Sequence, residues 1–235
     1  MVADDGRRDR ADESGAAGRA GVGGRGPDVT AGGGVTAGVG ATAGRDATAG
    51  GHAGWTTTGS RVVYENRWIR VREDDVVRPD GGAGVYGVVE VRQPSVFVVA
   101  LTDDDEVVLV SQRRYTTGAV SVEVPAGGTD GEDPLVAARR ELAEETGLTA
   151  REWTEVGRMD ALNGIADAPE HVFLARGLAP VEGGDDGRGR VEEGIDSVRT
   201  VPFADALRLV TDGTIRDGET IAALAFAAIH LRRFH

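Results

Sequence analysis

The sequence contains no cysteine, no lysine and no long apolar run. Without cysteine the chain has no disulfide framework. No stretch approaches the roughly 20 apolar residues of a membrane-spanning helix. The Arg7-Arg8 pair is followed by polar residues and glycines instead of the hydrophobic core of a signal peptide. We therefore expect a cytoplasmic protein with no membrane partner.

Because lysine is absent, all 26 basic residues are arginine, and the formal net charge is -13. Nonspecific nucleic-acid binding depends on neutralising phosphates, so an acidic chain disfavours it, and we expect no nucleic-acid partner. The charge is unevenly placed. Residues 1–54 carry seven acidic and six basic side chains, so nearly all of the net charge belongs to the rest of the chain.

Residues 1–54 also contain sixteen glycines and no aromatic residue. Such a tract cannot bury enough apolar surface to offset the entropy of ordering it. We predict a disordered leader over residues 1–56, whose role as a tether, a salt-adapted tail or the product of a wrongly chosen start codon is open. One domain is expected over residues 57–235, with N-terminal strands in 57–92 and a core in 93–235.

After residue 55 the sequence changes to short runs typical of strands. Strands are predicted over residues 61–65, 68–77, 84–91, 95–101 and 106–111, and further on near 153–158, 171–175 and 196–201. The tetrapeptide Thr102-Asp-Asp-Asp105 predicts a hairpin between the fourth and fifth of these strands. Helices are predicted over 134–146 and near 203–211 and 217–233. This order of elements indicates an α+β fold, a sandwich of helices on a mixed sheet.

The helix over residues 134–146 has clear boundaries, because Asp133-Pro134 is a favourable start and Gly147 a favourable stop. Within it Glu141, Glu144 and Glu145 lie at i, i+3 and i+4, and so share one face. The simplest interpretation of this face is a solvated patch on an acidic protein. If the carboxylates are partly buried they need neutralising, and hard oxygen ligands suit Mg²⁺ or Mn²⁺ better than Zn²⁺.

The residues before this helix favour the metal interpretation. Glu123-Val-Pro-Ala-Gly-Gly128 predicts a strand that runs into a glycine loop, where backbone groups can approach a ligand closely. Glu132 follows at the end of the loop, and is positioned to pair with Arg140.

At these positions the chain resembles the Nudix hydrolases, whose box reads G-x5-E-x7-R-E-U-x-E-E-x-G-U, with U a bulky aliphatic residue. The agreement covers eight positions, namely Glu132, Arg140, Glu141, Leu142, Glu144, Glu145, Gly147 and Leu148. The first glycine departs from the pattern, since Ala126 occupies its position and Gly127 is one residue too close to Glu132. We interpret this as a one-residue deletion in the loop.

The resemblance implies a Nudix-type α/β/α sandwich and a role for each matching residue. Glu141 and Glu145 would be the main ligands of Mg²⁺ or Mn²⁺, with Glu144 an accessory ligand and the Ala126 carbonyl a further one. Arg140 would orient a glutamate.

Shorter phrases resemble the ADP-ribose pyrophosphatase branch of the family. They are Val63-Tyr-Glu-Asn66, Arg78-Pro-Asp-Gly81, Gln112-Arg-Arg-Tyr115, Glu123-Val-Pro-Ala-Gly127 and Phe173-Leu-Ala175. This implies that Arg114 faces the substrate phosphates and that Glu123 accepts a hydrogen bond from a base or ribose. For both residues a salt bridge within the sheet is the alternative interpretation.

In this branch the catalytic base usually comes from a mobile loop after the box. Residues 183–194 are the flexible, acidic candidate here, with Glu193 as first choice and Glu192 as second. Asp167 and Glu170, in another loop, are the next candidates, and each of these side chains could equally be a solvated charge.

The implied reaction is cleavage of a nucleoside diphosphate derivative by a homodimer, with ADP-ribose split into AMP and ribose 5-phosphate. The branch often has Pro-Gly-Ile where this chain has Asn163-Gly-Ile165. Another sugar nucleotide, a dinucleoside polyphosphate or a nucleoside triphosphate therefore stays open as substrate. A non-catalytic regulator that binds nucleotide sugars is the alternative of another class.

Overall fold

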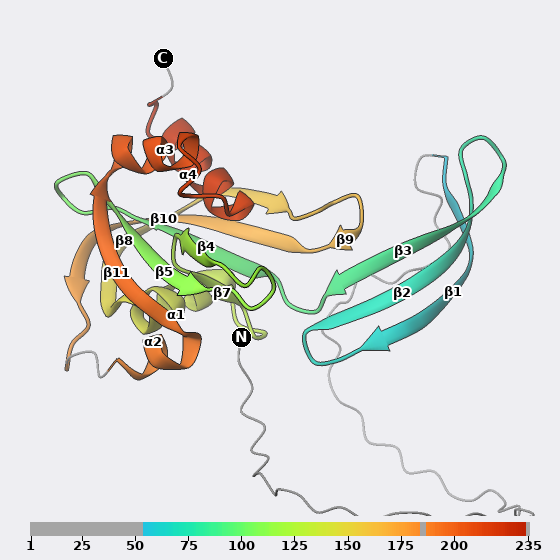
Figure 1. The fold of residues 1–235 in the computed structure, drawn as a ribbon, viewed down its shortest axis with the longest axis horizontal. Coiled ribbons are helices and arrows are strands. Elements are labelled where there is room, and N and C mark those ends of the chain that lie inside the picture. Colours follow the sequence, from blue (N-terminus) through green and yellow to red (C-terminus); the bar gives the residue numbers. More distant parts are fainter. Residues whose placement is uncertain (1–53, 184–186, 234–235) are drawn as a thin grey trace, which may run out of the picture. The chain divides into compact units, whose positions relative to one another are not determined.

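The structure, a computed structural model, describes residues 54–183 and 187–233 (Figure 1). Almost all of the predicted leader lies outside these residues. The first strand begins at Thr56, one residue inside the range predicted for the leader. In the part of the chain that is described, no helix combines the length and apolar character needed to cross a bilayer.

Two sheets form the centre of the domain. The first has the strand order β7-β4-β10-β8 and contains β4 (Ser95–Ala100), β7 (Ala126–Gly128), β8 (Leu148–Asp160) and β10 (Pro169–Pro180). The second has the order β11-β5-β6 and contains β5 (Glu106–Arg113), β6 (Val120–Glu123) and β11 (Ile195–Pro202). Strands β4 and β10 are parallel and the other pairs antiparallel, so the predicted mixed sheet is confirmed.

The predicted hairpin between residues 95–101 and 106–111 is wrong in its pairing. The turn itself forms, because the Thr102 amide donates to the Glu106 carbonyl (2.9 Å) and Leu101 bridges to Val107. Beyond the turn, however, β4 and β5 separate into different sheets. Both strands are almost completely buried. A continuous apolar run indicates burial on both faces but does not say which strand lies alongside.

In residues 54–183 and 187–233, four helices accompany the sheets, namely α1 (Pro134–Thr146), α2 (Arg188–Glu193), α3 (Phe203–Thr211) and α4 (Gly218–His230). Helix α1 has the predicted bounds, with the Asp133 side chain accepting from the Leu135 amide (2.9 Å) and Gly147 in the left-handed conformation. Helix α2 was not predicted: residues 183–194 were expected to be a flexible loop, and Arg188–Glu193 are helical.

The side chains of β4 point alternately into two separate cores. Phe97, Val99 and Leu101 pack in a cluster that includes Leu224 and Ala228 of α4. Val96, Val98 and Ala100 pack in a second cluster that includes Ala138 and Leu142 of α1. Each fully buried valine or leucine side chain in these clusters contributes roughly 1.5–3 kcal/mol. Because helices cover both faces, the architecture is the α/β/α sandwich expected from the resemblance.

A third sheet has the order β1-β2-β3-β9. Its strands are β1 (Thr56–Glu65), β2 (Ile69–Val77), β3 (Ala83–Val91) and β9 (Ala166–Asp167). Strand β9 belongs to the segment that links β8 with β10, and it pairs with β3 in parallel. In addition, the Tyr86 hydroxyl donates to the Gly164 carbonyl (2.6 Å).

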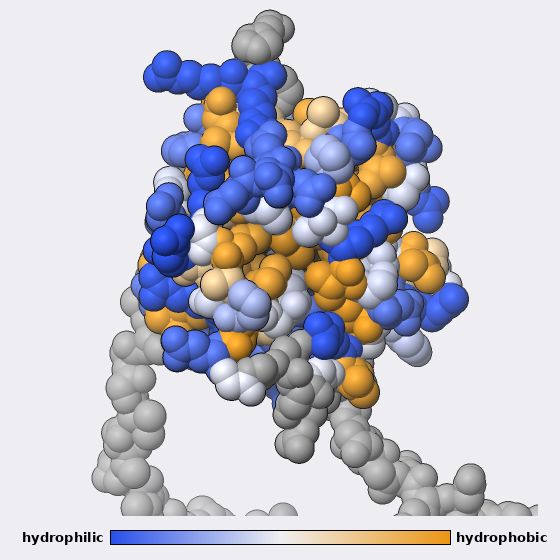
Figure 2. Space-filling view, turned by 90° about the vertical axis from the view of Figure 1, so that its left-hand side faces the viewer, coloured by the Kyte–Doolittle hydropathy of each residue, from blue (hydrophilic) through white to orange (hydrophobic). Residues whose placement is uncertain are grey.

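On the face of the molecule shown in Figure 2, hydrophilic and apolar residues are interspersed.

Candidate active site

Helix α1 presents two buried carboxylates one turn apart. Glu141 is 5% exposed and Glu145 is 2% exposed, whereas Glu144 lies on the more exposed side of the helix. The three residues therefore do not form a solvated patch. Two of them are held in the protein interior, where an unneutralised carboxylate is costly.

Arg140 links the helix to the segment before it. Its Nε donates to Glu132 Oε2 (3.0 Å), and its Nη1 donates to Glu141 Oε1 (2.8 Å) and Glu144 Oε2 (3.1 Å). Its Nη2 donates to the Gly128 carbonyl (2.9 Å). The predicted pairing of Arg140 with Glu132 is thus confirmed. Burial lowers the pKa of Arg140, but hydrogen bonds and attraction from its glutamates outweigh it and raise the pKa.

The backbone of β7 lies against both buried carboxylates. The Ala126 amide donates to Glu145 Oε2 (3.0 Å). At Gly127, a Cβ atom would lie 2.1 Å from Glu141 Oε1, so only glycine leaves room for this carboxylate. The glycines expected in a loop are therefore in a strand, since Ala126–Gly128 pair with β4. The close approach that small residues were expected to allow does occur.

The charged forms of both carboxylates are disfavoured. Burial raises the pKa of Glu141 to about 7 against the opposing effect of Arg140, and the nearby Glu144 and Glu193 charges raise it further. Burial also raises the pKa of Glu145 well above its ordinary value, and the Glu141 charge adds to this, while the Ala126 amide opposes it. A cation beside the pair would stabilise both carboxylates in their charged form.

The donor set fits a hard divalent cation. Glu141 and Glu145 supply carboxylate oxygens, Glu144 precedes Glu145 in the helix, and the Ala126 amide contacts Glu145. Within residues 54–183 and 187–233, no three acidic or imidazole side chains converge closely enough to enclose an ion. Mg²⁺ suits this arrangement, because it binds one or two carboxylates and completes its shell with water and substrate phosphates.

Helix α2 packs against α1 and carries the predicted catalytic base. The Glu193 charge raises the pKa of both Glu141 and Glu145, so the Glu193 carboxylate lies within electrostatic range of the pair. The side chain of Glu192, the second choice, lies outside the described residues.

Arg114 and Glu123 form the salt bridge that was the alternative interpretation of each, and their contact with substrate stays a prediction. Arg114 Nε donates to Glu123 Oε1 (2.9 Å), and Arg114 Nη2 donates to Glu123 Oε2. Glu123 is 3% exposed, and its hydrogen bond to Arg114 is the main reason that the Arg114 pKa is raised. Glu145 also attracts Arg114, so the ion pair lies within electrostatic range of the carboxylates of α1.

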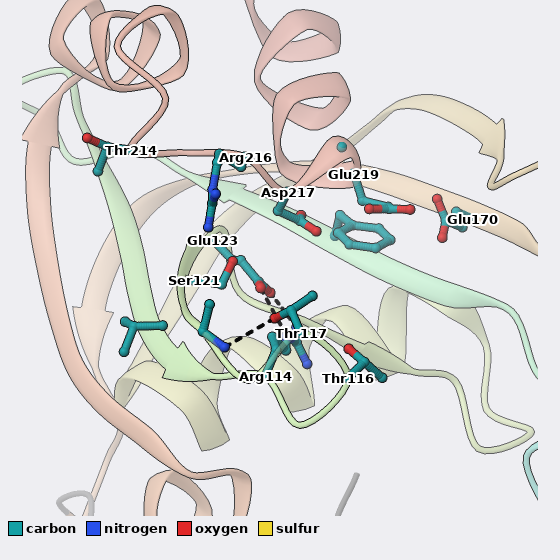
Figure 3. Close-up of a pocket in the computed structure, with 14 residues that line it drawn as sticks. Arg114, Thr116, Thr117, Ser121, Glu123, Glu170, Thr214, Arg216, Asp217 and Glu219 are labelled. Atoms are coloured by element: carbon teal, nitrogen blue, oxygen red, sulfur yellow. Dashed lines mark hydrogen bonds and ion pairs between the residues drawn. The ribbon is translucent and has the colours of Figure 1, made fainter.

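A cavity of about 680 Å³ opens beside this ion pair (Figure 3). Arg114 and Glu123 line it together with Glu170 of β10 and with Arg216, Asp217 and Glu219 at the start of α4. Sequence reasoning did not find the three residues from α4, since they lie about a hundred positions after Arg114. The only local signal there is the Asp217 cap, which accepts from the Thr220 amide (2.7 Å) and marks a helix start.

Comparison with known proteins gives matches over the described domain. The NUDIX domain matches residues 91–224, and the nucleoside diphosphate sugar hydrolase N-terminal domain matches residues 55–89. The chain is 33% identical over 171 residues to an ADP-ribose pyrophosphatase of Bacillus subtilis (strain 168), which covers 72% of this chain and 90% of that relative.

Two further relatives are similar over a comparable length. An ADP-ribose pyrophosphatase of Mycobacterium tuberculosis (strain ATCC 25618 / H37Rv) is 35% identical over 178 residues, covering 74% of this chain and 82% of the relative. The methanol dehydrogenase activator of Bacillus methanolicus is 30% identical over 172 residues, covering 72% of this chain and 90% of the relative. Among solved structures, an ADP compounds hydrolase has the same fold, with a TM-score of 0.66, 22% identity, and coverage of 76% of this chain and 95% of that one.

Proposed function

The chain belongs to the NUDIX family, and from this premise we propose that it is a divalent-metal-dependent pyrophosphohydrolase that converts ADP-ribose to AMP and ribose 5-phosphate. The observation that carries the proposal is the buried pair Glu141 and Glu145 against the β7 backbone, with pKa values raised and Arg140 alongside. Relatives named ADP-ribose pyrophosphatase support the choice of substrate.

We assign Glu141 and Glu145 as the residues that hold Mg²⁺ or Mn²⁺, with Glu144 and the Ala126 carbonyl as accessory ligands. The bound ion would offset phosphate charge and lower the pKa of the attacking water. Arg140 fixes the position of Glu141 through its 2.8 Å hydrogen bond, and the Ala126 amide fixes Glu145. The ligands are therefore positioned before substrate arrives.

In the reaction, the oxygen of water attacks one phosphorus of the diphosphate, and the bond from that phosphorus to the bridging oxygen breaks. Glu193 accepts the proton of the water, since its carboxylate lies within electrostatic range of the metal-binding pair. Arg114 contacts the diphosphate. Two of its nitrogens bind Glu123, while its Nη1 makes no hydrogen bond to any described residue and is available to a phosphate oxygen.

The test is a panel of nucleoside diphosphate derivatives with Mg²⁺ or Mn²⁺, with the Glu145→Gln variant alongside. Because glutamine keeps the shape of the side chain but lacks its charge, we expect activity to fall by about a hundredfold or more, as the metal contributes several kcal/mol. Manganese binding, followed by its electron paramagnetic resonance signal, is expected to weaken in parallel.

The apo stability of Glu145→Gln should equal or exceed that of the parent, since burial already disfavours the charged glutamate. Glu152→Gln, at an exposed position of β8, is the matched control. Unchanged activity and manganese binding in Glu145→Gln would remove the metal assignment. A folded protein that binds derivatives without turnover would instead indicate the non-catalytic regulator.

We also propose that the protein is a homodimer. Strand β1 is ten residues long and lies at the edge of its sheet, where its unpaired backbone groups can bind another chain. Val62, Val63 and Tyr64 in this strand are all about half exposed. Multi-angle light scattering is expected to give twice the monomer mass of 24.4 kDa. A monomer at the concentrations used for the activity assay would contradict this.

We place the enzyme in the cytoplasm, where nucleotide derivatives are found. The absence of cysteine suits a reducing compartment. The net charge of -13 supports a small-molecule substrate instead of a nucleic acid.

A further inference from the structure

One end of the cavity beside Arg114 is acidic. Glu170 comes from β10, and Asp217 and Glu219 come from the start of α4. Glu170 is 7% exposed, yet its Oε2 has no hydrogen-bond partner among the described residues. Burying a carboxylate oxygen without a donor is costly, so this atom points to a ligand group that supplies one.

The acidic end has little counter-charge, since Arg114 attracts Asp217 only through space. Among residues 54–183 and 187–233, no arginine or histidine forms an ion pair with Glu170, Asp217 or Glu219. Burial and then the neighbouring Glu219 and Asp217 charges raise the pKa of Glu170 to about 7. Burial also raises the pKa of Glu219, and its own backbone amide offsets this only in part. A positive charge placed here would relieve both effects.

The other end of the cavity carries the positive side chains. Arg114 lies there, and Figure 3 shows Arg216 directed toward the Glu123 and Ser121 side. The carboxylates of Glu219 and Glu170 point toward one another at the opposite side of the same view. The cavity is therefore polarised, with Arg114, which is within electrostatic range of Glu145, at one end and the carboxylates of Glu170 and Glu219 at the other.

A polarised cavity of this kind complements a ligand that is itself dipolar. We propose that the cavity selects nucleoside diphosphate derivatives whose second moiety carries an ammonium group, with Glu170 and Glu219 binding the ammonium and Arg114 and Arg216 facing the diphosphate. This rests on the proposed function. A neutral sugar would give Glu170 a hydrogen bond, but it would leave the repulsion between Glu170 and Glu219 unrelieved.

Two adenosine derivatives test the proposal, ADP-glucose and ADP-glucosamine, which differ in one hydroxyl replaced by ammonium. With Mg²⁺ at neutral pH, kcat/KM is expected to be about tenfold or more higher for ADP-glucosamine, because its ammonium group is attracted by the charged forms of Glu170 and Glu219. In Glu219→Gln and Glu170→Gln this ratio should fall toward one. In the control Glu152→Gln, at an exposed site in β8, the ratio should be unchanged. Equal kcat/KM for the two derivatives in the parent protein would overturn the proposal.

Binding measurements test this inference independently of whether the protein hydrolyses any nucleoside diphosphate derivative. Glucosamine 1-phosphate and glucose 1-phosphate are titrated into the full chain without divalent metal and followed by calorimetry. Tighter binding of glucosamine 1-phosphate, lost in Glu219→Gln, would support the acidic end even if no derivative were hydrolysed. Equal binding of the two phosphates would overturn the inference while leaving the hydrolase assignment in place.

Discussion

At the scale of single residues, Gly127 provides a sensitive test of the proposed metal site. A methyl group at this position would lie 2.1 Å from Glu141 Oε1, and Glu141 is buried and held by Arg140. We expect Gly127→Ala to displace Glu141 and to lower kcat by about tenfold or more, as misplacement by about 1 Å can cost a hundredfold.

Gly128→Ala is the matched control for this change. A Cβ at Gly128 meets only Asp130 Oδ1, at 3.9 Å, so activity should stay close to that of the parent. Circular dichroism checks that both variants are folded. Equal activities for Gly127→Ala and Gly128→Ala would show that Glu141 has no positional role in catalysis.

The proposed base Glu193 gives a second prediction at this scale. Glu193→Gln removes the proton acceptor, and positioned proton transfer usually contributes about 10²–10⁴-fold. We expect kcat to fall by this amount. Glu182→Gln, at an exposed position after β10, should leave kcat unchanged. A loss of less than about tenfold in Glu193→Gln would assign the base elsewhere.

At the scale of elements, the sequence predicted what local signals determine. The bounds of α1 follow from Asp133, Pro134 and Gly147, all of which act within one turn of the helix end. The pairing of Glu132 with Arg140 also follows from short spacing, since eight positions separate them. The helix face that carries Glu141 and Glu145 was therefore predictable from the sequence.

The features that the sequence did not predict depend on contacts between segments that are far apart in the chain. The apolar runs of β4 and β5 are alike, so nothing in them indicated that the strands enter different sheets. Arg114 and Glu123 were predicted as separate substrate contacts, but the pairing of β5 with β6 brings them together. Glu219 reaches the cavity only because α4 packs beside β4, a contact that no local pattern encodes.

The hydrogen bond between α4 and the residue that follows β6 gives a prediction about stability. Thr220 is completely buried, and its hydroxyl accepts from the Val124 amide (3.2 Å), next to Glu123. Thr220→Val keeps the shape but leaves this buried amide without an acceptor. We expect the free energy of unfolding in urea to fall by about 1–3 kcal/mol.

Thr211→Val is the control for this prediction, because the Thr211 hydroxyl donates to the Arg208 carbonyl at an exposed site. Its free energy of unfolding should change by less than about 0.5 kcal/mol. Equal free energies of unfolding for the two variants would show that the hydrogen bond between the Val124 amide and the Thr220 hydroxyl does not stabilise the packing of α4.

At the scale of the whole molecule, the buried carboxylates predict how stability depends on pH. Glu141 and Glu170 each have a pKa of about 7 in the folded protein, against an ordinary value of 4.5. Between these two values the folded state binds more protons than the unfolded state, so stability falls as pH rises. The carboxylates with lowered pKa, Glu65 and Glu155, act in the opposite direction but below this window.

We therefore expect the urea midpoint of the metal-free protein to decrease from pH 5 to pH 8. Mg²⁺ should raise the midpoint at pH 8 more than at pH 5, because it binds the charged carboxylates of the folded state. The net charge of -13 also makes the folded protein more stable at lower pH, because protonation reduces the repulsion between its acidic side chains. The Glu141→Gln variant separates this general effect from the effect of Glu141. This variant should flatten the pH dependence and reduce the response to Mg²⁺, whereas Glu152→Gln removes a surface charge and should do neither. A Mg²⁺ response in Glu141→Gln equal to that of the parent would mean that the ion binds away from α1.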